Sequence, residues 1–157
     1  MAVRHEMRLI ENRQRVVRVR EGPLEEFLEN ILEEIGLGPE SVAVRLIGDG
    51  EMARLNLTYR KKKGPTDVLS FPVEADSTKP GTLKQQVRRA RGKFLGDIAI
   101  APRVARRNAK LLGRGLPEEL KVLILHGVLH LLGYDHETDR GEMERIEVRL
   151  RRKLGIA

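Results

Sequence analysis

The sequence predicts a single α+β domain of 157 residues, in which helices surround a small mixed sheet of about four strands. Short β-branched segments alternate with longer segments whose apolar residues repeat at helical spacing. One of the longer segments, expected to begin at Pro117, is apolar on nearly all sides and therefore indicates a buried central helix. No internal repeat divides residues 1–157, and a chain of this length suits one hydrophobic core.

The expected strands are short runs of β-branched and apolar residues. The first is placed within residues 7–20, around Val16, Val17 and Val19. Further strands are expected at residues 41–47, 67–71 and 94–101. Gly64 and Pro65 favour a turn immediately before the third of them.

The expected helices have proline in the first turn or glycine after the last one. Asp49 is expected to be the N-cap of the second helix. A stripe of apolar residues on the last helix is interpreted as core packing, Met143 included. The expected helices cover residues 23–35, 49–59 and 102–112, the segment from Pro117 through His130, and the stripe Met143, Ile146, Leu150 and Leu154.

The composition indicates a folded protein of a reducing compartment. Hydrophobic residues make up 40% of the chain and charged residues 34%, a balance that is typical of globular domains rather than of disordered ones. The chain contains no cysteine, so a disulfide framework is excluded. No stretch is apolar enough for an export signal or a membrane span. We therefore expect a cytoplasmic protein that does not associate with membranes.

Positive charge is concentrated in one part of the chain. The net charge is +7, yet residues 1–50 carry 7 basic and 10 acidic residues. Residues 84–114 carry 10 basic residues and one acidic residue, Asp97. This asymmetry predicts a surface that faces a polyanion, with nucleic acid favoured, while an arginine-rich surface without a partner is the alternative. Residues 76–93 are expected to form a long basic surface loop, with room for a short helix near residues 83–91.

Three of the four histidines lie in one segment of eleven residues, which predicts a metal site. His126 and His130 are four residues apart and share one face of a helix. Gly133 can end the helix and turn the chain, so that His136 approaches the other two. Three imidazole ligands with a fourth position open to water are typical of catalytic zinc. One Zn²⁺ per chain is favoured, although nickel, copper and iron also suit imidazole ligands, and hydrogen-bonded core histidines are the alternative.

The expected chemistry of such a site is hydrolysis. The histidine spacing matches that of metzincin metallopeptidases, which place a glutamate directly after the first histidine as general base. Here that position is Gly127, which cannot exchange a proton, so peptidase activity is disfavoured. Asp135 and Glu137 flank His136 and are candidates for a base or for orienting a ligand, the alternative being loop solvation.

Other polar residues are candidates for contacts with phosphate groups. Arg60 has the planar guanidinium that suits a phosphate and could stabilise charge on a phosphodiester. Ser70 and Asp97 lie at the ends of expected strands, in structural positions or close to the metal. The remaining candidates for RNA binding are basic side chains, which occur at Lys61, Lys62, Lys63, Arg88, Arg89 and Arg91. For residues 60–63 a solvated basic loop is the alternative.

Three segments, HGVLHLLGYDH, NLTYRKKKGPTDVLSFP and FLGDIAIA, together resemble the YbeY family of bacterial rRNA-maturation endoribonucleases. The resemblance implies a zincin-like α+β fold and a zinc ion bound by His126, His130 and His136. It also implies cleavage of single-stranded RNA in maturation of the 3′ end of 16S rRNA and in ribosome quality control. The functionally important arginine of the family falls on Arg60. One departure is the basic stretch 76–93, which is longer than the usual connection.

We therefore expect a metal-dependent endoribonuclease whose partners are single-stranded RNA and the small ribosomal subunit or its assembly factors. Aromatic residues make up only 3% of the chain, so RNA should bind mainly through its phosphates and in a strongly salt-dependent way. Attack by water and attack by the 2′-OH of the RNA both remain open. The alternatives are a zincin-type metallopeptidase and a non-catalytic ribosome-assembly factor with a structural metal.

Overall fold

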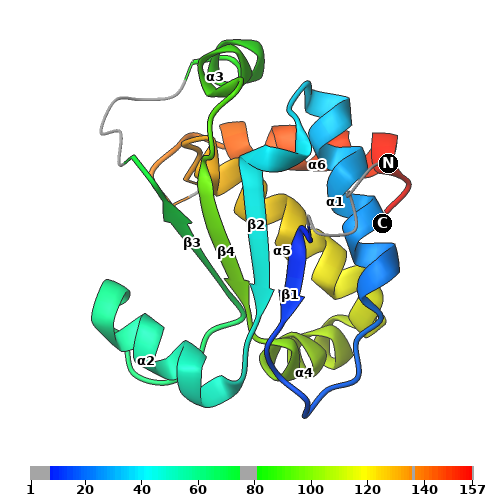
Figure 1. Cartoon of the computed structure of the whole chain (residues 1–157), viewed down its shortest axis with the longest axis vertical. Helices are drawn as coiled ribbons and strands as arrows, with labels where there is room; N and C mark the ends of the chain where they lie inside the picture. Colours follow the sequence, from blue (N-terminus) through cyan, green and yellow to red (C-terminus); the bar gives the residue numbers. More distant parts are fainter. Residues whose placement is uncertain (1–7, 75–80, 136, 157) are drawn as a thin grey trace, which may run out of the picture.

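The computed structural model describes residues 8–74, 81–135 and 137–156. Its centre is a four-stranded mixed sheet, as expected (Figure 1). The strands β1 (Ile10–Asn12), β2 (Val42–Leu46) and β4 (Gly96–Ile100) are parallel, and β3 (Val68–Pro72) runs antiparallel to β4 at one edge. The order across the sheet is β1-β2-β4-β3.

Most helices lie on one face of the sheet, where α5 (Leu116–Leu131) crosses behind the strands in Figure 1. Met52 and Leu55 of α2 (Asp49–Arg60) instead pack with Leu69 of β3 on the other face, and α2 and α3 (Leu83–Ala90) lie at opposite ends of the sheet. α5 contacts β3 and β4 as well as α1, α4 and α6. The described helices are α1 (Glu21–Ile35), the short 3-10 turn η2 (Pro39–Ser41), α2 (Asp49–Arg60), α3 (Leu83–Ala90), α4 (Pro102–Leu112), α5 (Leu116–Leu131) and α6 (Glu142–Leu154).

The main core lies between the sheet and α5. Alternate residues of β2 point to this side, because side chains along a strand alternate between its two faces. Val42, Val44 and Leu46 are buried there, whereas Arg45 is exposed on the opposite face. α5 is buried on most sides, as its apolar composition predicted, and Met143 of α6 is fully buried in the same core. The described helices include none that is long and apolar enough to span a membrane.

The first strand is not where the valines suggested. β1 covers Ile10–Asn12, and the segment around Val16 and Val17 is not a strand. The reason is the buried side chain of Gln14, which satisfies the backbone of Val17 locally. Gln14 Nε2 donates to Val17 O at 2.8 Å, and Val17 N donates to Gln14 Oε1 at 2.9 Å. Such side-chain bonds compete with strand pairing, and here they override the β propensity of valine.

Helix boundaries agree with the sequence signals to within one or two residues. Gly48, not Asp49, is the N-cap of α2, and Asp49 is its first residue. The Asp49 carboxylate forms no capping hydrogen bond and instead lies 3.9 Å from Arg103 Nε on α4. Its negative charge still lies at the end of the helix that favours an acid.

Within residues 76–93, which were expected to form a surface loop with room for a short helix, residues 83–90 form α3. Val87 and Ala90 are buried, because the apolar side of this helix packs against the rest of the domain. The short helix that the sequence allowed near residues 83–91 is therefore confirmed. Residues 76–80 lie outside the described residues.

Candidate functional site

The two histidines of α5 converge. His126 and His130 are one helical turn apart, and their Nε2 atoms are separated by 3.1 Å. The rings meet edge to face, with centroids 4.7 Å apart and an interplanar angle of 69°. Both residues are half-buried, so the pair lies at the surface of the core rather than within it.

The separation of the two nitrogens suits a shared metal ion. Two imidazole nitrogens that each lie about 2.0–2.1 Å from a tetrahedral zinc ion are roughly 3.3–3.4 Å apart. A hydrogen bond between neutral imidazoles has a similar length, so the distance alone fits both interpretations. His136, the expected third ligand, lies outside the described residues. Within the described ranges no group of three His, Cys, Asp or Glu side chains forms a metal site, so the three-histidine site stays a prediction.

A carboxylate from α6 faces the back of the first histidine. Glu147 Oε2 lies 3.6 Å from His126 Nδ1, and the Glu147 side chain is only 15% exposed. A carboxylate beside Nδ1 favours the tautomer that carries its proton there, which leaves the Nε2 lone pair for a metal. Sequence reasoning missed Glu147, although an acid between the buried residues Met143 and Leu150 was a usable signal.

Gly127 is required by the packing of α5 on the sheet. An added Cβ would lie 2.8 Å from two carbon atoms of the Ile98 side chain and 3.0 Å from a third. The carbonyl oxygen of Gly127 accepts a hydrogen bond of 3.3 Å from Ser70 Oγ of β3, so Ser70 has a structural role. A glutamate at this position, as in the metzincins, would have no space. The prediction that disfavoured a peptidase therefore has a steric basis in addition to the chemical one.

Asp97 lies on the other face of the sheet. Its neighbour Ile98 packs against α5, and alternation along β4 therefore turns Asp97 away from the histidines. Asp97 Oδ1 forms an ion pair of 3.5 Å with Arg45 Nη2 on the adjacent strand. This placement contradicts a position for Asp97 close to the metal site and leaves it a structural role.

The acidic residues after α5 shape the loop that contains the third histidine. Gly133 adopts a positive φ of 102°, which turns the chain after the last helical turn as expected. Asp135 Oδ1 accepts a hydrogen bond of 3.0 Å from the backbone of Glu137, so its carboxylate closes a local turn. The carboxylate of Asp139 accepts from the backbone of Met143 at 2.9 Å and thereby caps α6. These contacts favour a positioning role for Asp135 over that of a base.

Arg60 reaches the same loop from α2. It is the last residue of α2, and its Nη2 lies 3.8 Å from Glu137 Oε1. The side chains of Arg60 and Glu137 are 38% and 62% exposed, so this ion pair contributes little to stability and leaves the guanidinium accessible to a ligand. Asn56 holds the following turn by donating from Nδ2 to Gly64 O at 2.8 Å. The residues of this turn, Lys61, Lys62 and Lys63, are all exposed.

α3 contacts the end of α5 from another direction. Gln86 Nε2 donates to Leu132 O at 2.9 Å, and the Tyr134 hydroxyl donates to Gly81 O at 3.1 Å. Burial raises the pKa of Tyr134 above its ordinary value, so its hydroxyl stays protonated and able to donate this bond further into the alkaline range than that of a free tyrosine. Arg88, Arg89 and Arg91 are exposed on and just after this helix.

The comparisons with known proteins give one family. The sequence model described as Endoribonuclease YbeY matches residues 9–155. The chain belongs to this family. A protein of Solibacter usitatus named Endoribonuclease YbeY is 41% identical over 88% of this chain and 82% of its own length. Another of the same name, from Aquifex aeolicus, is 42% identical over 82% of this chain and 77% of its own length.

A solved structure supports the fold of this YbeY family member. The solution structure of a Thermotoga maritima protein is similar to it with a TM-score of 0.56 and 27% sequence identity. The similarity covers 92% of this chain and 88% of the Thermotoga protein. The resemblance to the YbeY family that the sequence motifs carried is thus confirmed, and so is the expected mixed α and β architecture.

Proposed function

We propose that this protein is a zinc-dependent, single-strand-specific endoribonuclease that acts in maturation of the 3′ end of 16S rRNA and in ribosome quality control. Membership of the endoribonuclease YbeY family supports the reaction class. The observation that carries the site is the convergence of the Nε2 atoms of His126 and His130 at 3.1 Å. Single-stranded RNA, the small ribosomal subunit and its assembly factors are the proposed partners. Such a substrate would place the protein in the cytoplasm.

The proposed metal ligands are His126, His130 and His136, with one Zn²⁺ per chain and another divalent transition metal as the alternative. When bound, the ion supplies Lewis acidity, which lowers the pKa of water and stabilises negative charge on a phosphodiester oxygen. The chain itself orients the first ligand through Glu147, which lies 3.6 Å from His126 Nδ1. Gly133 turns the chain after α5 with a positive φ of 102°, and the Asp135 carboxylate accepts a hydrogen bond from the Glu137 backbone.

Arg60 is proposed to bind the phosphodiester and to neutralise charge that develops on it. The guanidinium is accessible, and Arg60 ends a helix whose following turn is held by the buried Asn56 through Gly64 O. Its partner Glu137 holds it beside the loop of the third histidine, and a phosphate can replace that exposed carboxylate at little cost. Lys61, Lys62 and Lys63 extend the positive charge along the incoming strand.

The decisive experiment compares cleavage of one single-stranded RNA by four proteins: the wild type, metal-stripped protein, Arg60→Ala and Arg54→Ala. Arg54 is an exposed arginine of the same helix and serves as the matched control. Removing one charge-stabilising donor typically lowers kcat by about 10²–10³, so Arg60→Ala should lose this much while Arg54→Ala stays close to wild type. Circular dichroism should show both variants folded.

Product ends and alternative substrates complete the test. A 2′,3′-cyclic phosphate would identify the 2′-OH as the nucleophile, whereas direct hydrolysis would leave none. Intact RNA with all preparations would contradict the enzyme and favour the non-catalytic assembly factor. Proteolysis of a protein substrate would favour the metallopeptidase, which the packing of Gly127 against Ile98 argues against.

A further inference from the structure

α3 is a docked helix rather than a loose connection between β3 and β4. Thr82 and Gln85 form a capping box, in which each side chain accepts a hydrogen bond from the other residue's backbone. Val87 and Ala90 are buried against the domain. The chain therefore builds a stable helical turn here and fixes its apolar side inward.

The helix is attached to the segment that leaves the histidine helix. Gln86 Nε2 donates a hydrogen bond to Leu132 O at 2.9 Å, and the Tyr134 hydroxyl donates one to Gly81 O at 3.1 Å. Leu132 and Tyr134 follow His130 closely in the chain. The position of α3 is consequently tied to that of the candidate metal site.

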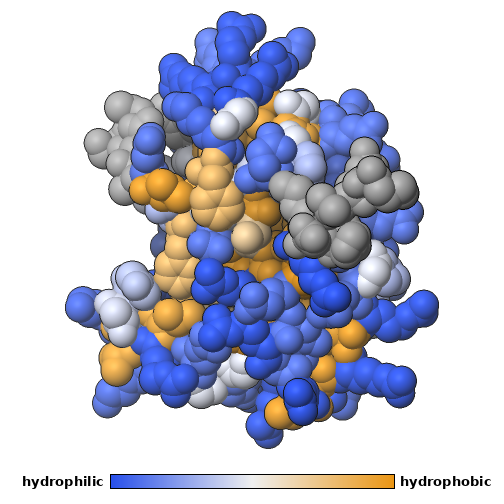
Figure 2. Space-filling model, in the orientation of Figure 1, coloured by the Kyte–Doolittle hydropathy of each residue, from blue (hydrophilic) through white to orange (hydrophobic). Residues whose placement is uncertain are grey.

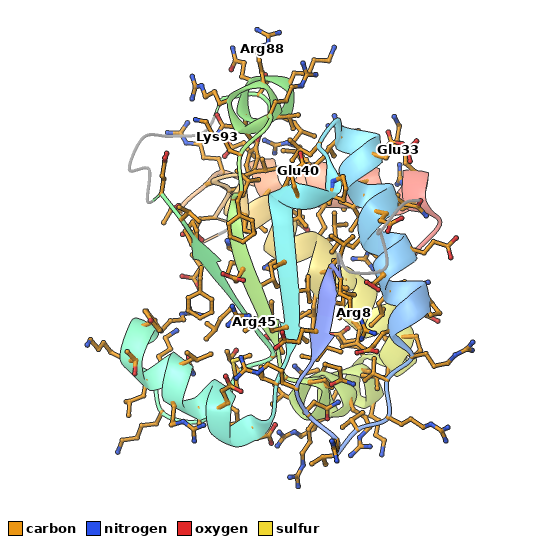
Figure 3. All side chains as sticks on the ribbon, in the orientation of Figure 1. Arg8, Glu33, Glu40, Arg45, Arg88 and Lys93 are labelled. Atoms are coloured by element: carbon orange, nitrogen blue, oxygen red, sulfur yellow. The ribbon has the colours of Figure 1, made fainter. Side chains whose placement is uncertain are left out.

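The outward side of α3 is strongly basic. Between Gly81 and Gly96 the sequence contains no acidic residue. Figure 2 shows a hydrophilic surface over this end of the molecule, and Arg88 points away from the body of the domain in Figure 3. The helix dipole favours Arg88 and Arg89 in the last turn, but Lys84 and Arg88 lie one helical turn apart and repel each other, so helix stability explains only part of the cluster. The exposed cations of this cluster are Lys84, Arg88, Arg89, Arg91 and Lys93. None of them forms an ion pair with another described residue.

A second basic group lies at the other end of the sheet. The exposed lysines of residues 61–63 follow α2, which is separated from α3 by the length of the strands (Figure 1). Arg60 contacts the loop after α5 through Glu137, and α3 contacts the start of the same loop through Leu132 and Tyr134. The two basic groups therefore reach the surroundings of the histidine pair from different directions. An extended polyanion that passes the histidines can contact both.

We propose that α3 is a second RNA-binding element, which holds the RNA strand on one side of the cleaved bond and makes affinity depend on RNA length. This inference rests on the proposed function. The occupant is the phosphate backbone of single-stranded RNA, because the side chains of this cluster are arginine and lysine, which bind phosphates, and the exposed Phe94 after Lys93 is a face on which any base can stack. A membrane surface fits less well, since Val87 and Ala90 are buried and the helix has no apolar side to insert.

The test compares two triple variants that remove the same charge from opposite ends of the domain. The first is Arg88→Ala/Arg89→Ala/Arg91→Ala, and the control on α4 is Arg106→Ala/Arg107→Ala/Lys110→Ala, whose residues are also exposed. Binding is measured by fluorescence anisotropy in the presence of a chelator, with single-stranded RNAs of about 4 and about 16 nucleotides.

For the longer RNA, the α3 variant should bind about a hundredfold more weakly at 0.1 M salt, because its salt slope is reduced by about 2 over the decade below 1 M. Affinity for the shorter RNA should not change, and the α4 variant should resemble the wild type. If the triple variant does not fold, Arg88→Ala alone should reduce the slope by about 0.7.

Equal losses in the α3 and α4 variants would overturn the inference, as would equal losses for short and long RNA. Stronger binding of the wild type to phosphatidylserine vesicles than to RNA would overturn it as well. Because binding is measured without metal, absence of RNA cleavage would refute the proposed function and leave this result standing. Normal binding by the α3 variant of an active enzyme would refute this inference alone.

Discussion

Replacing Gly127 with alanine tests how closely α5 lies on the sheet. The new Cβ would meet three carbons of Ile98 at 2.8, 2.8 and 3.0 Å, well inside the separation of about 3.5–4.0 Å at which carbon atoms attract each other. Ile98 is fully buried and belongs to the main core, so it has no free space into which it can move. The helix or the strand must therefore shift.

The expected magnitude follows from two opposing effects. Overpacking of a core typically costs about 1–3 kcal/mol. Alanine in place of glycine within a helix contributes roughly 0.5–1 kcal/mol of stability. Gly127→Ala should therefore lower the free energy of unfolding by about 1–2 kcal/mol.

Urea unfolding followed by circular dichroism measures this loss. Gly22→Ala in α1 is the matched control, because nothing lies within 4 Å of the new Cβ there, and it should be neutral or slightly stabilising. Ile98→Ala removes all three contacting atoms, so the double variant should be more stable than the sum of the single effects by about 0.5–3 kcal/mol. A Gly127→Ala protein as stable as the control, or additive effects at the two sites, would refute the steric argument.

Three further predictions concern single side chains. Glu147→Gln should weaken Zn²⁺ binding about 10- to 100-fold in a chelator competition while the metal-free melting curve stays unchanged, and unaltered affinity would exclude an orienting role. Gln14→Ala should lower the free energy of unfolding by about 1–3 kcal/mol in urea, because the buried backbone of Val17 loses both partners; a loss well below this range would show that water replaces them. The pKa of Glu119 is raised above 4.5, mainly by burial, against the opposing effect of Arg114. The folded protein therefore binds more protons here than the unfolded chain between pH 4.5 and the raised pKa, and stability falls as pH rises through this window. Glu119→Gln should remove that fall. Urea unfolding at several pH values should therefore show the wild-type free energy of unfolding decreasing relative to that of the variant as pH rises. A difference between the two proteins that does not change with pH would contradict the raised pKa of Glu119.

Much of the fold was predictable from local signals. Glycine and proline positions located the helix ends, and the apolar composition of α5 predicted its burial because a central helix meets neighbours on every side. The first strand was misplaced because the deciding interaction, from Gln14 to the backbone of Val17, is specific to one side chain. The strand propensity of the valines gives no information about such a hydrogen bond.

The candidate site was predictable only where its residues are close in sequence. The four-residue spacing of His126 and His130 predicts that they share one face of the helix, and in the structure their Nε2 atoms are 3.1 Å apart. Glu147 comes from another helix, and only the packing of α6 on α5 brings it to His126. Asp97 shows the opposite case, because its place in the chain suggested proximity while strand alternation turns it to the other face. The third ligand, His136, remains a prediction.

The attachment of α6 makes the candidate metal site part of a reciprocal equilibrium. This helix supplies Glu147 to His126, and its first turn is capped by Asp139 from the loop after α5. An ion that binds only when α6 is docked stabilises the docked state by mass action, and α6 docking in turn is required for the ion's affinity. At an ion concentration 100 times Kd this stabilisation amounts to about 2.7 kcal/mol. A substitution that weakens the packing of the buried Leu150 on α6 would then lower metal affinity, although the Leu150 side chain does not coordinate the ion.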